Sequence, residues 1–220
     1  MVGELPLSAI IPGDKLANMF SERVHSRQAQ RQATQRVVLD AAEALFHAQG
    51  FKATTVRQIA SRAGVSIGTV MAAGDKDRLL VSVMDQRIEL MHQARMLPET
   101  GFLAMKAGNN APEMVAALAH PFLALFAEDL DLAREYGAIL IKGRHNSAVF
   151  GALAFQLTAE FEQAFKLFGL PREAAHRAAT TAHLSYLGIL LAWAGGAYDQ
   201  QSALHQLKET VGALMGAEGK

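Results

Sequence analysis

The sequence predicts an all-α protein of about nine helices, with a three-helix head near the N-terminus and a larger helical body after it. Two observations predict this fold class. Apolar residues recur at intervals of three and four along most of the 220-residue chain, which is the period of an amphipathic helix. Runs of β-branched residues and Asn-Gly turns, which would indicate strands and hairpins, are missing. Half of the residues are hydrophobic and 19% are charged, so the chain has enough apolar surface for a folded core.

The first helix of the head is expected over about residues 34–49. Val38 and Phe46 fall on its apolar face, and Gly50 can end it because glycine readily takes the left-handed conformation of a helix C-cap. The residues before this helix are predicted to form an arm, with a loose helix over about residues 15–30.

Short capping signals define the next two helices. Thr55 and Gln58 have the spacing of a capping box, so the second helix is expected to begin after Thr55 and to end at Gly64. Ser66 is a favourable N-cap for the third helix. This helix is expected to end early, one or two residues before Gly74, which acts as its stop.

The body is expected to contain six helices. They are one from Asp75 to beyond Met91, one from Pro112 with a kink at Pro121, and four over about residues 129–142, 147–168, 171–194 and 202–215.

The spacing around residue 60 favours a helix-turn-helix. Two helices that cross steeply need a small residue where their backbones meet, and Ala60 supplies it. Gly64 suits the turn because it tolerates positive φ. Val70 then stands where a buried anchor of the second helix of the pair is needed, and Ile59 and Val65 fill the space between the helices.

The charge of the chain is unevenly distributed although its formal net charge is zero. Residues 21–64 contain seven Lys or Arg and three Asp or Glu, whereas residues 96–220 contain nine and twelve. A basic N-terminal third indicates a polyanionic partner for that part alone.

These features together resemble the TetR family of transcriptional regulators. The resemblance rests on "AAEALFHAQGFKATTVRQIASRAGVSIGT", residues 41–69, followed by "DKDRLL" at residues 75–80. It implies a basic arm over residues 1–30, a helix-turn-helix DNA-binding domain over residues 31–80 and an effector-binding and dimerisation domain over residues 81–220. The function implied is that of a repressor, which a small hydrophobic or aromatic effector releases from its DNA operator.

The resemblance also implies how the head meets double-stranded DNA. The third helix would enter the major groove with Ile67, Thr69, Met71 and Ala72 facing the bases, while Gly68 allows close approach of the backbone. Helix N-termini and basic side chains would contact phosphates. The full set of expected DNA-binding residues is Arg23, Arg27, Arg31, Thr55, Arg57, Ser66, Ile67, Gly68, Thr69, Met71, Ala72 and Lys76.

The sequence departs from the family pattern after Thr69. The family usually has Leu-Tyr-x-x-Phe here, whereas this chain has "VMAAGDK", with Met71 in the place of the tyrosine and no phenylalanine. The tyrosine ordinarily contacts a phosphate, and the phenylalanine holds the reading helix on its neighbours. An alternative function therefore stays open, that of a helical protein which sequesters a ligand or partner and binds DNA only weakly.

A di-iron carboxylate bundle is a remote alternative. Two Glu-x-x-His pairs, at Glu89 and His92 and at Glu173 and His176, lie on separate expected helices, as such a site requires. The further carboxylates would come from Glu128, Glu135, Glu160 or Glu162. Hydrolase, phosphate-loop and zinc-protease motifs are missing from the sequence. An enzyme is therefore not expected, and neither is a metal or cofactor.

The effector is expected inside the body, among apolar and aromatic side chains with a few polar groups. The candidates are Phe102, Met105, Phe122, Phe126, Tyr136, Arg144, Phe155, His183, Tyr186 and, as a further enclosing residue, Trp193. His145 is a further polar candidate.

A homodimer is expected through the last two helices, which the resemblance implies form a four-helix bundle with the partner's. The contacting residues are predicted to be Ala178, Ala182, Ser185, Gly188 and Ile189 on one helix and Leu204, Leu207, Val211 and Leu214 on the other. The sequence has no secretory signal and no apolar run long enough to span a bilayer, so a cytoplasmic protein without membrane contact is expected.

Overall fold

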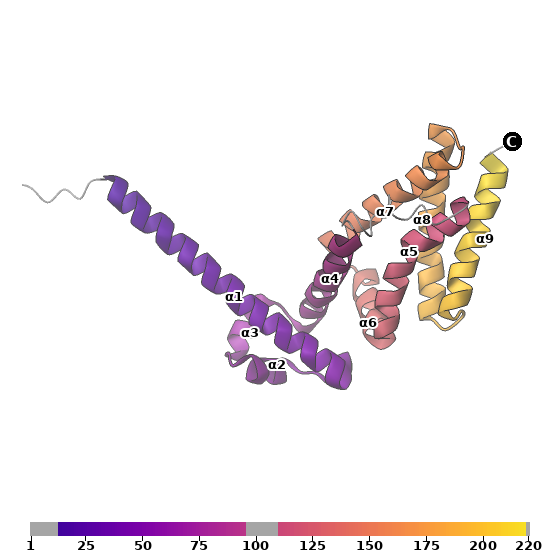
Figure 1. Cartoon of the computed structure of the whole chain (residues 1–220). Coiled ribbons are helices and arrows are strands. Elements are labelled where there is room, and N and C mark those ends of the chain that lie inside the picture. The colour runs from indigo at the N-terminus through magenta and orange to yellow at the C-terminus, as the bar shows by residue number, and fades with distance from the viewer. Residues whose placement is uncertain (1–12, 96–109, 219–220) are drawn as a thin grey trace, which may run out of the picture.

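The computed structural model describes the backbone of residues 13–95 and 110–218, and the side chains of residues 27–95 and 110–217. Over these residues the chain forms nine helices and no strand, so the predicted all-α fold is confirmed. The helices are α1 (Gly13–Ala53), α2 (Val56–Ala63), α3 (Ile67–Ala73), α4 (Lys76–Arg95), α5 (Ala111–Glu128), α6 (Leu130–Ile141), α7 (Ala148–Leu167), α8 (Arg172–Ala194) and α9 (Gln200–Glu218). The head, made by α1, α2 and α3, is joined through α4 to a body that contains α5 to α9 (Figure 1).

Helix α1 is longer than predicted. It begins at Gly13 instead of near residue 34, so the expected arm and the first head helix form one continuous helix. The reason is local, since no glycine or proline lies between Asp14 and Gln49. Regular geometry stops at Gly50, which has φ 80° and ψ 161°, as predicted. The N-terminal half of α1 projects away from the rest of the molecule (Figure 1).

The capping signals of the head act as predicted. The Thr55 and Gln58 side chains form a complete capping box at the start of α2, and Gly64 ends α2 in the left-handed conformation, with φ 65°. Helix α3 ends at Ala73, immediately before Gly74. Gly74 has φ 152°, and a Cβ there would lie 2.7 Å from Cγ of Arg78, so only glycine fits this stop.

A small core holds the three head helices together. Val38 and Phe46 of α1, Ile59 of α2 and Val70 of α3 are all buried, and Leu79 of α4 joins them. Ala60 is also buried at the crossing of α2 and α3, as the helix-turn-helix spacing predicts. Val70 is the one buried residue of α3, and it anchors that helix in this core.

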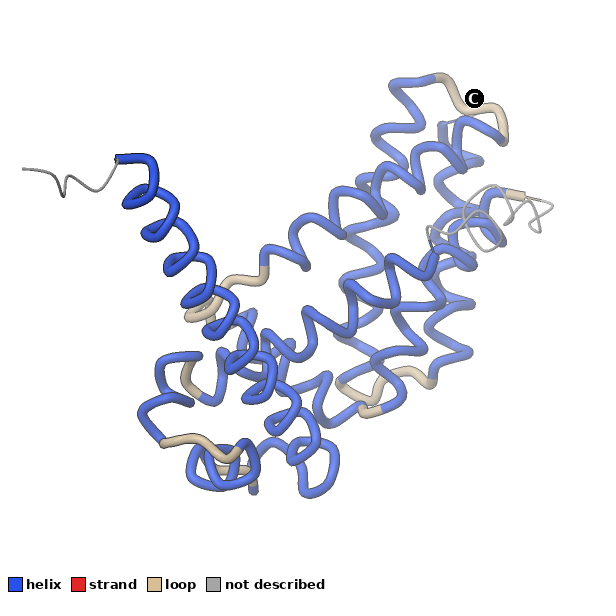
Figure 2. Tube along the Cα trace, turned by 60° about the vertical axis from the view of Figure 1, so that its left-hand side comes forward, coloured by secondary structure: helices blue, strands red, loops and turns tan. Residues whose placement is uncertain are grey.

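The body is a bundle in which α5 packs against α7 and α9, α7 against α8, and α8 against α9 (Figure 2). Its core contains fully buried aromatic and aliphatic side chains such as Phe161, Phe165, Leu118 and Leu123. Among the described residues, none of the helices is sufficiently long and apolar to cross a bilayer.

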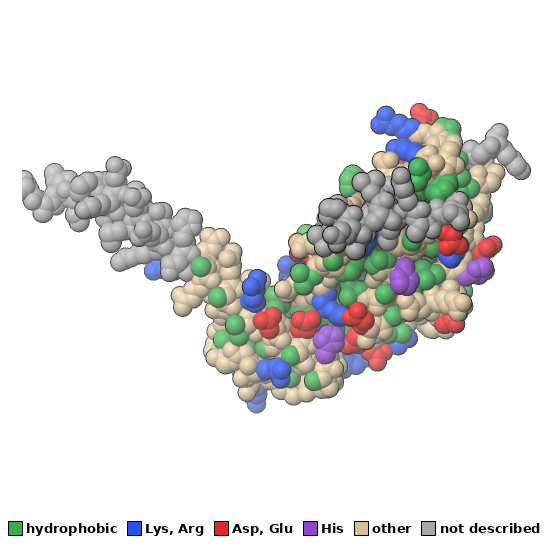
Figure 3. All heavy atoms as spheres, in the orientation of Figure 1, with side chains coloured by type: hydrophobic (Ala, Val, Ile, Leu, Met, Phe, Trp, Pro, Cys, Tyr) green, Lys and Arg blue, Asp and Glu red, His purple; other side chains and the backbone are tan. Residues whose placement is uncertain are grey.

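Ion pairs join the head to the body. Nζ of Lys52, at the end of α1, lies 3.1 Å from Oε1 of Glu135 on α6. Nδ1 of His47 lies 3.2 Å from Oδ2 of Asp129, which caps α6. Figure 3 shows acidic and basic side chains gathered where the two parts meet. Helix α6 is therefore in direct contact with the head.

Candidate nucleic-acid interface and effector cavity

The exposed face of α3 is small and mainly apolar. Val70 points into the head core, whereas Ile67, Gly68, Met71 and Ala72 are exposed to solvent. Ile67, Met71 and Ala72 are three of the four side chains predicted on the outer face, and the fourth, Thr69, is half-buried. The surface carries methyl and methylene groups without a charged side chain, so any discrimination between bases here depends on shape and apolar contact.

Ser66 and Thr69 are held together at the leading end of α3. Oγ of Ser66 accepts a hydrogen bond from N–H of Thr69 at 3.0 Å, and the two hydroxyl oxygens are 2.9 Å apart. Ser66 is exposed and Thr69 is half-buried. The cap therefore fixes the direction of the Thr69 side chain at the edge of the outer face.

A groove of about 430 Å³ separates α3 from the extended part of α1. Arg27, Arg31 and Thr34 of α1 line one side of it, and Thr69 and Ala72 line the other. Ala72 and Ala73, at the end of α3, have short side chains and leave this space open. Basic side chains of α1 and the end of α3 thus border one shared groove.

The other predicted DNA contacts have different surroundings. Thr55 is exposed but its hydroxyl belongs to the capping box, and Arg57 is exposed on α2. Nζ of Lys76 donates a hydrogen bond to the carbonyl oxygen of Phe51 at 3.0 Å and lies 4.2 Å from the centre of its ring. Through these two contacts with Phe51, Lys76 connects the start of α4 to the end of α1. The side chain of Arg23 lies outside the described residues.

A second cavity, of about 340 Å³, lies in the body between α6, α7 and α8. We call it the outer cavity. Its lining is almost entirely apolar. The residues that line it are Phe126, Ala133, Tyr136, Gly137, Leu140, Ile141, Phe150, Leu187, Leu190, Leu191, Trp193 and Ala194.

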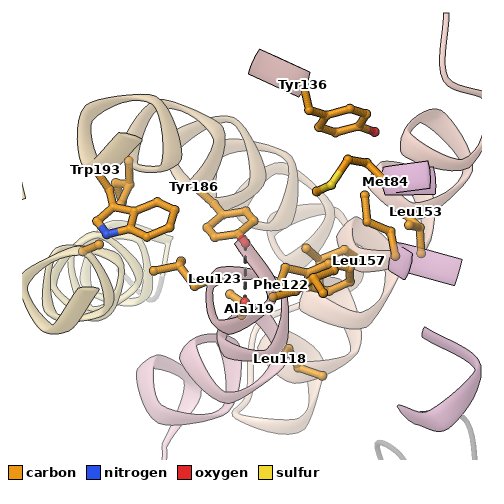
Figure 4. Packing of buried hydrophobic residues seen from close by; sticks show 14 of the residues in the cluster. Met84, Leu118, Ala119, Phe122, Leu123, Tyr136, Leu153, Leu157, Tyr186 and Trp193 are labelled. Atoms are coloured by element: carbon orange, nitrogen blue, oxygen red, sulfur yellow. Dashed lines mark hydrogen bonds between the residues drawn. The ribbon is translucent and has the colours of Figure 1, made fainter. Parts of the chain in front are cut away.

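A smaller space of about 40 Å³, the inner cavity, adjoins the outer one. Phe126, Phe150, Leu187 and Leu190 line both, so the two spaces lie side by side along α8. The inner cavity is further lined by Ile88, Phe122, Leu153, Ala154, Leu157, His183 and Tyr186. Figure 4 shows Phe122, Leu157 and Tyr186 in this part of the core, with the Tyr186 hydroxyl bonded to the carbonyl oxygen of Ala119.

The structure brings together five of the residues predicted to contact an effector, namely Phe122, Phe126, Tyr136, His183 and Tyr186, and also Trp193. Two others are elsewhere on the surface, because Arg144 lies in the exposed turn after α6 and Phe155 is 81% exposed on α7. Phe102 and Met105 lie outside the described residues. His145 faces Asp75 of the head at 3.3 Å and lines neither cavity.

Sequence reasoning missed Phe150, Leu187 and Leu190, although each lines both cavities. The spacing of His183, Leu187 and Leu190, at intervals of four and three, was a signal that could have found two of them. The position of Phe150 depends on how α7 crosses α8, for which the sequence contains no such signal.

A hydrogen-bond network links the outer cavity to α4. The Tyr136 hydroxyl donates to Oδ1 of Asp85 on α4 at 3.0 Å, and the Ser147 hydroxyl donates to the same oxygen at 2.6 Å. Oγ of Ser147 in turn accepts from N–H of Phe150, capping α7. Burial raises the pKa of Tyr136 well above its usual value, so the phenol stays protonated and remains a donor.

The carboxylates considered for a di-iron site are dispersed. Glu135 pairs with Lys52, Glu160 with Arg95 and Glu162 with His176, each at 3.1 Å or less. Among the residues that the structure describes, no three His, Asp or Glu side chains come together as metal ligands would. One Glu-x-x-His pair thus lies on α4 and the other on α8, and the two do not come together in one metal site. Hydrogen bonds from Lys166 and His176 lower the pKa of Glu162, as expected for an ion-paired carboxylate.

Helix α8 presents a different face from the one predicted for dimer contacts. Ala178, Ala182 and Ile189 are buried within the protomer, against neighbouring helices of the bundle. On α9, Leu207 and Val211 are buried in the same way, and Leu204 and Leu214 are half-buried. The uncovered side of α8 instead carries Leu184, Gly188 and Leu191, spaced by four and three residues. Among the α8 residues that were predicted to make dimer contacts, only Gly188 is exposed, and Ser185 is half-buried.

Comparisons with known proteins agree with this architecture. Residues 38–81 match the model of the bacterial regulatory proteins of the tetR family. No curated protein sequence matches the chain. A TetR transcriptional regulator from a Rhodococcus species has a similar solved structure, with a TM-score of 0.60 and 18% identity, covering 84% of this chain and 97% of that chain.

Two further solved structures have the same fold. A TetR-family regulator from Mesorhizobium loti gives a TM-score of 0.57 at 19% identity, covering 85% of this chain and 97% of that chain. FadR of Thermus thermophilus, a repressor solved in complex with lauroyl-CoA, gives 0.53 at 22% identity, covering 82% and 92%. At these identities the likeness concerns the fold alone.

Proposed function

Residues 38–81 are a TetR-family helix-turn-helix, and from this premise we propose that the protein is a repressor that binds a DNA operator as a homodimer. A small hydrophobic or aromatic effector in the body releases it. The observation that carries the DNA-binding part is the outer face of α3, which is exposed while Val70 anchors the helix in the head core. A helix held in this way can enter the major groove without losing its packing.

We infer that residues at the N-terminal end of α3 contact the bases and that α1 contacts the DNA backbone. Ile67, Met71 and Ala72 offer apolar groups for thymine methyls, and Thr69 adds one hydroxyl. Arg27 and Arg31 border the same groove as Thr69, so a phosphate near them lies beside the bases that α3 reaches. This arrangement supplies backbone contacts that the missing tyrosine would otherwise make.

Two substitutions on α3 separate base reading from backbone contact. Thr69→Ala should change which bases are preferred, because Ser66 holds the Thr69 hydroxyl on the α3 side of the groove. Met71→Tyr should strengthen binding to all sites by about 1 kcal/mol, the net value of one hydrogen bond, through a phosphate contact. Selection of bound sequences and fluorescence anisotropy measure the two effects, with Met71→Leu as the matched control. If Thr69→Ala keeps the preference and Met71→Tyr keeps the affinity, α3 is not the reading element.

The arginines of α1 should contribute affinity without sequence preference. Replacing Arg27 and Arg31 by Ala, with or without Arg23, removes positive charge near the backbone and should weaken binding to all sequences alike. The slope of log affinity against log salt should fall by roughly 1 for each phosphate that the variant no longer neutralises. A titration at several salt concentrations measures this. A changed base preference at an unchanged slope would contradict the assignment.

We place the homodimer on α8 and α9, with Leu184, Gly188 and Leu191 at the centre of the contact. These residues form one apolar stripe on the uncovered side of α8. Gly188 lets two helices approach closely, and the flanking leucines then pack around the crossing point. The stripe can meet its own copy across a two-fold axis, as an isologous interface requires.

We infer that effector binding reaches the head through α6 and α4. Tyr136 lines the outer cavity and bonds to Asp85 of α4, while the residue before it, Glu135, pairs with Lys52 of the head. A ligand that displaces α6 therefore changes contacts on both α4 and α1. The ligand can shift the head only if it binds the two arrangements with different affinity.

Selection of bound DNA from a random pool tests the proposed function. A regulator should enrich a sequence with two related half-sites, and the enriched DNA should bind more tightly than scrambled DNA at the same salt concentration. Equal, strongly salt-dependent binding to both would contradict operator recognition. The absence of any binding would favour the alternative, a protein that sequesters a ligand or partner.

A further inference from the structure

His183 is a polar residue with no polar partner in the middle of an apolar core. It lies on α8, is 9% exposed and lines the inner cavity. Its Nδ1 atom is buried and has no hydrogen-bond partner. Phe161 and Tyr186 flank the ring, with centroids 6.4 and 6.5 Å away. A buried nitrogen in this state costs free energy, which a hydrogen-bonding group in the cavity would recover.

The neighbouring polar groups already have partners. The Tyr186 hydroxyl donates to the carbonyl oxygen of Ala119 at 3.4 Å, and the Tyr136 hydroxyl in the outer cavity donates to Asp85. Among the residues lining the two cavities, His183 is the one with an orphaned buried side-chain nitrogen. A ligand thus meets apolar surface along the outer cavity and one unsatisfied polar group at the inner end.

The surroundings favour an uncharged ligand. Burial lowers the pKa of His183, so its ring is neutral at neutral pH and offers no positive charge. The half-buried Arg95 pairs with Glu160 at 2.8 Å and lies over the ring of Phe122, 5.1 Å from its centre, and it lines neither cavity. Nε and Nη1 of Arg95 have no partner, but the Glu160 carboxylate already balances its charge. A carboxylate ligand would lose its water without gaining a free counter-ion.

We propose that the effector is an uncharged molecule with an apolar body and one hydrogen-bonding oxygen, with the body in the outer cavity and the oxygen beside His183. This rests on the proposed effector-regulated function. The sizes agree, since about 340 Å³ accommodates a small ligand body, while about 40 Å³ leaves room only for a group of the size of a hydroxyl or carbonyl.

A pair of matched probes tests the position of the oxygen. Octan-1-ol and 1-chlorooctane have the same chain but differ in the ability to hydrogen-bond. Trp193 is the one tryptophan of the chain and lines the outer cavity, so its fluorescence reports occupancy. His183→Leu should weaken octan-1-ol binding by about tenfold and change 1-chlorooctane binding by less than about twofold. His120→Phe, on the exposed side of α5, is a control that should change neither.

Three results would overturn the proposal. Equal changes for both probes in His183→Leu would mean that the oxygen does not lie beside His183. Tighter binding of octanoate than of octan-1-ol to the unmodified protein would contradict the uncharged head. No fluorescence response to either probe up to its solubility limit would contradict an apolar ligand in this cavity.

A DNA-binding assay on the same proteins separates this inference from the proposed function. If octan-1-ol binds in a His183-dependent way but the protein selects no DNA, the ligand inference stands and the repressor function fails. If the protein selects an operator but binds neither octan-1-ol nor 1-chlorooctane, the repressor function stands and the ligand inference fails.

Discussion

Leu184→Asp is expected to convert the homodimer into a monomer. Leu184 is 63% exposed in the uncovered stripe of α8, and a carboxylate there would lose its water on association without a counter-charge. Since two heads joined in one dimer bind far more tightly than either alone, operator affinity should fall by about 100-fold or more. Light scattering after size exclusion measures the mass, and fluorescence anisotropy measures the affinity.

The matched control for this substitution is Leu90→Asp. Leu90 is 59% exposed on α4, so the same chemical change is made at similar exposure away from α8. The dimer and the DNA affinity should persist in this variant. A monomeric unmodified protein at micromolar concentration, or a dimer that survives Leu184→Asp, would contradict the interface.

Phe46→Ala is expected to destabilise the head strongly. Phe46 is 1% exposed between the helices of the head, and its ring lies 5.4 Å from that of Phe51. Removal of a buried phenylalanine leaves a cavity and typically lowers the free energy of unfolding by about 3–5 kcal/mol. Urea denaturation followed by circular dichroism measures this loss. DNA binding should fall with it, because the reading helix depends on this core for its orientation.

Val37→Ala provides the control on the same helix. Val37 is 46% exposed, so its truncation removes little buried surface and should change the free energy of unfolding by less than about 0.5 kcal/mol. A loss of stability as large as that of Phe46→Ala would mean that helix propensity of α1, and not the packing of the head, determines stability. A loss below about 1 kcal/mol for Phe46→Ala would contradict its role in the core.

The fold class and most helix boundaries follow from the amino-acid sequence alone, because these boundaries depend on residues close together in the chain. Thr55 and Gln58 form their capping box within one turn, and Gly64 and Gly74 end helices through their own backbone conformation. The chemical character of the outer face of α3 is equally local, since the burial of Val70 determines which of its neighbours on this short helix face solvent.

The continuity of α1 is also a local property, although an arm separate from the first head helix is the expectation from the sequence. Pro6, Pro12 and Gly13 favour an irregular start to the chain, although no helix-breaking residue separates Asp14 from the head. The proximity of the α1 arginines to α3 has no signal in the sequence. The groove that joins Arg27 and Arg31 to Thr69 depends on the crossing of α1 and α3 and on the alanines at the end of α3.

The buried face of α8 and the lining of the cavities depend on tertiary packing. Helix α8 has apolar residues around most of its circumference, so periodicity alone does not distinguish Ala178 and Ala182 from Leu184 and Leu191. The packing of α7 and α9 against it covers the alanine side and leaves the leucine side open. Likewise, the role proposed for His183 depends on packing, because helices far apart in sequence surround it without supplying a hydrogen-bond partner for Nδ1.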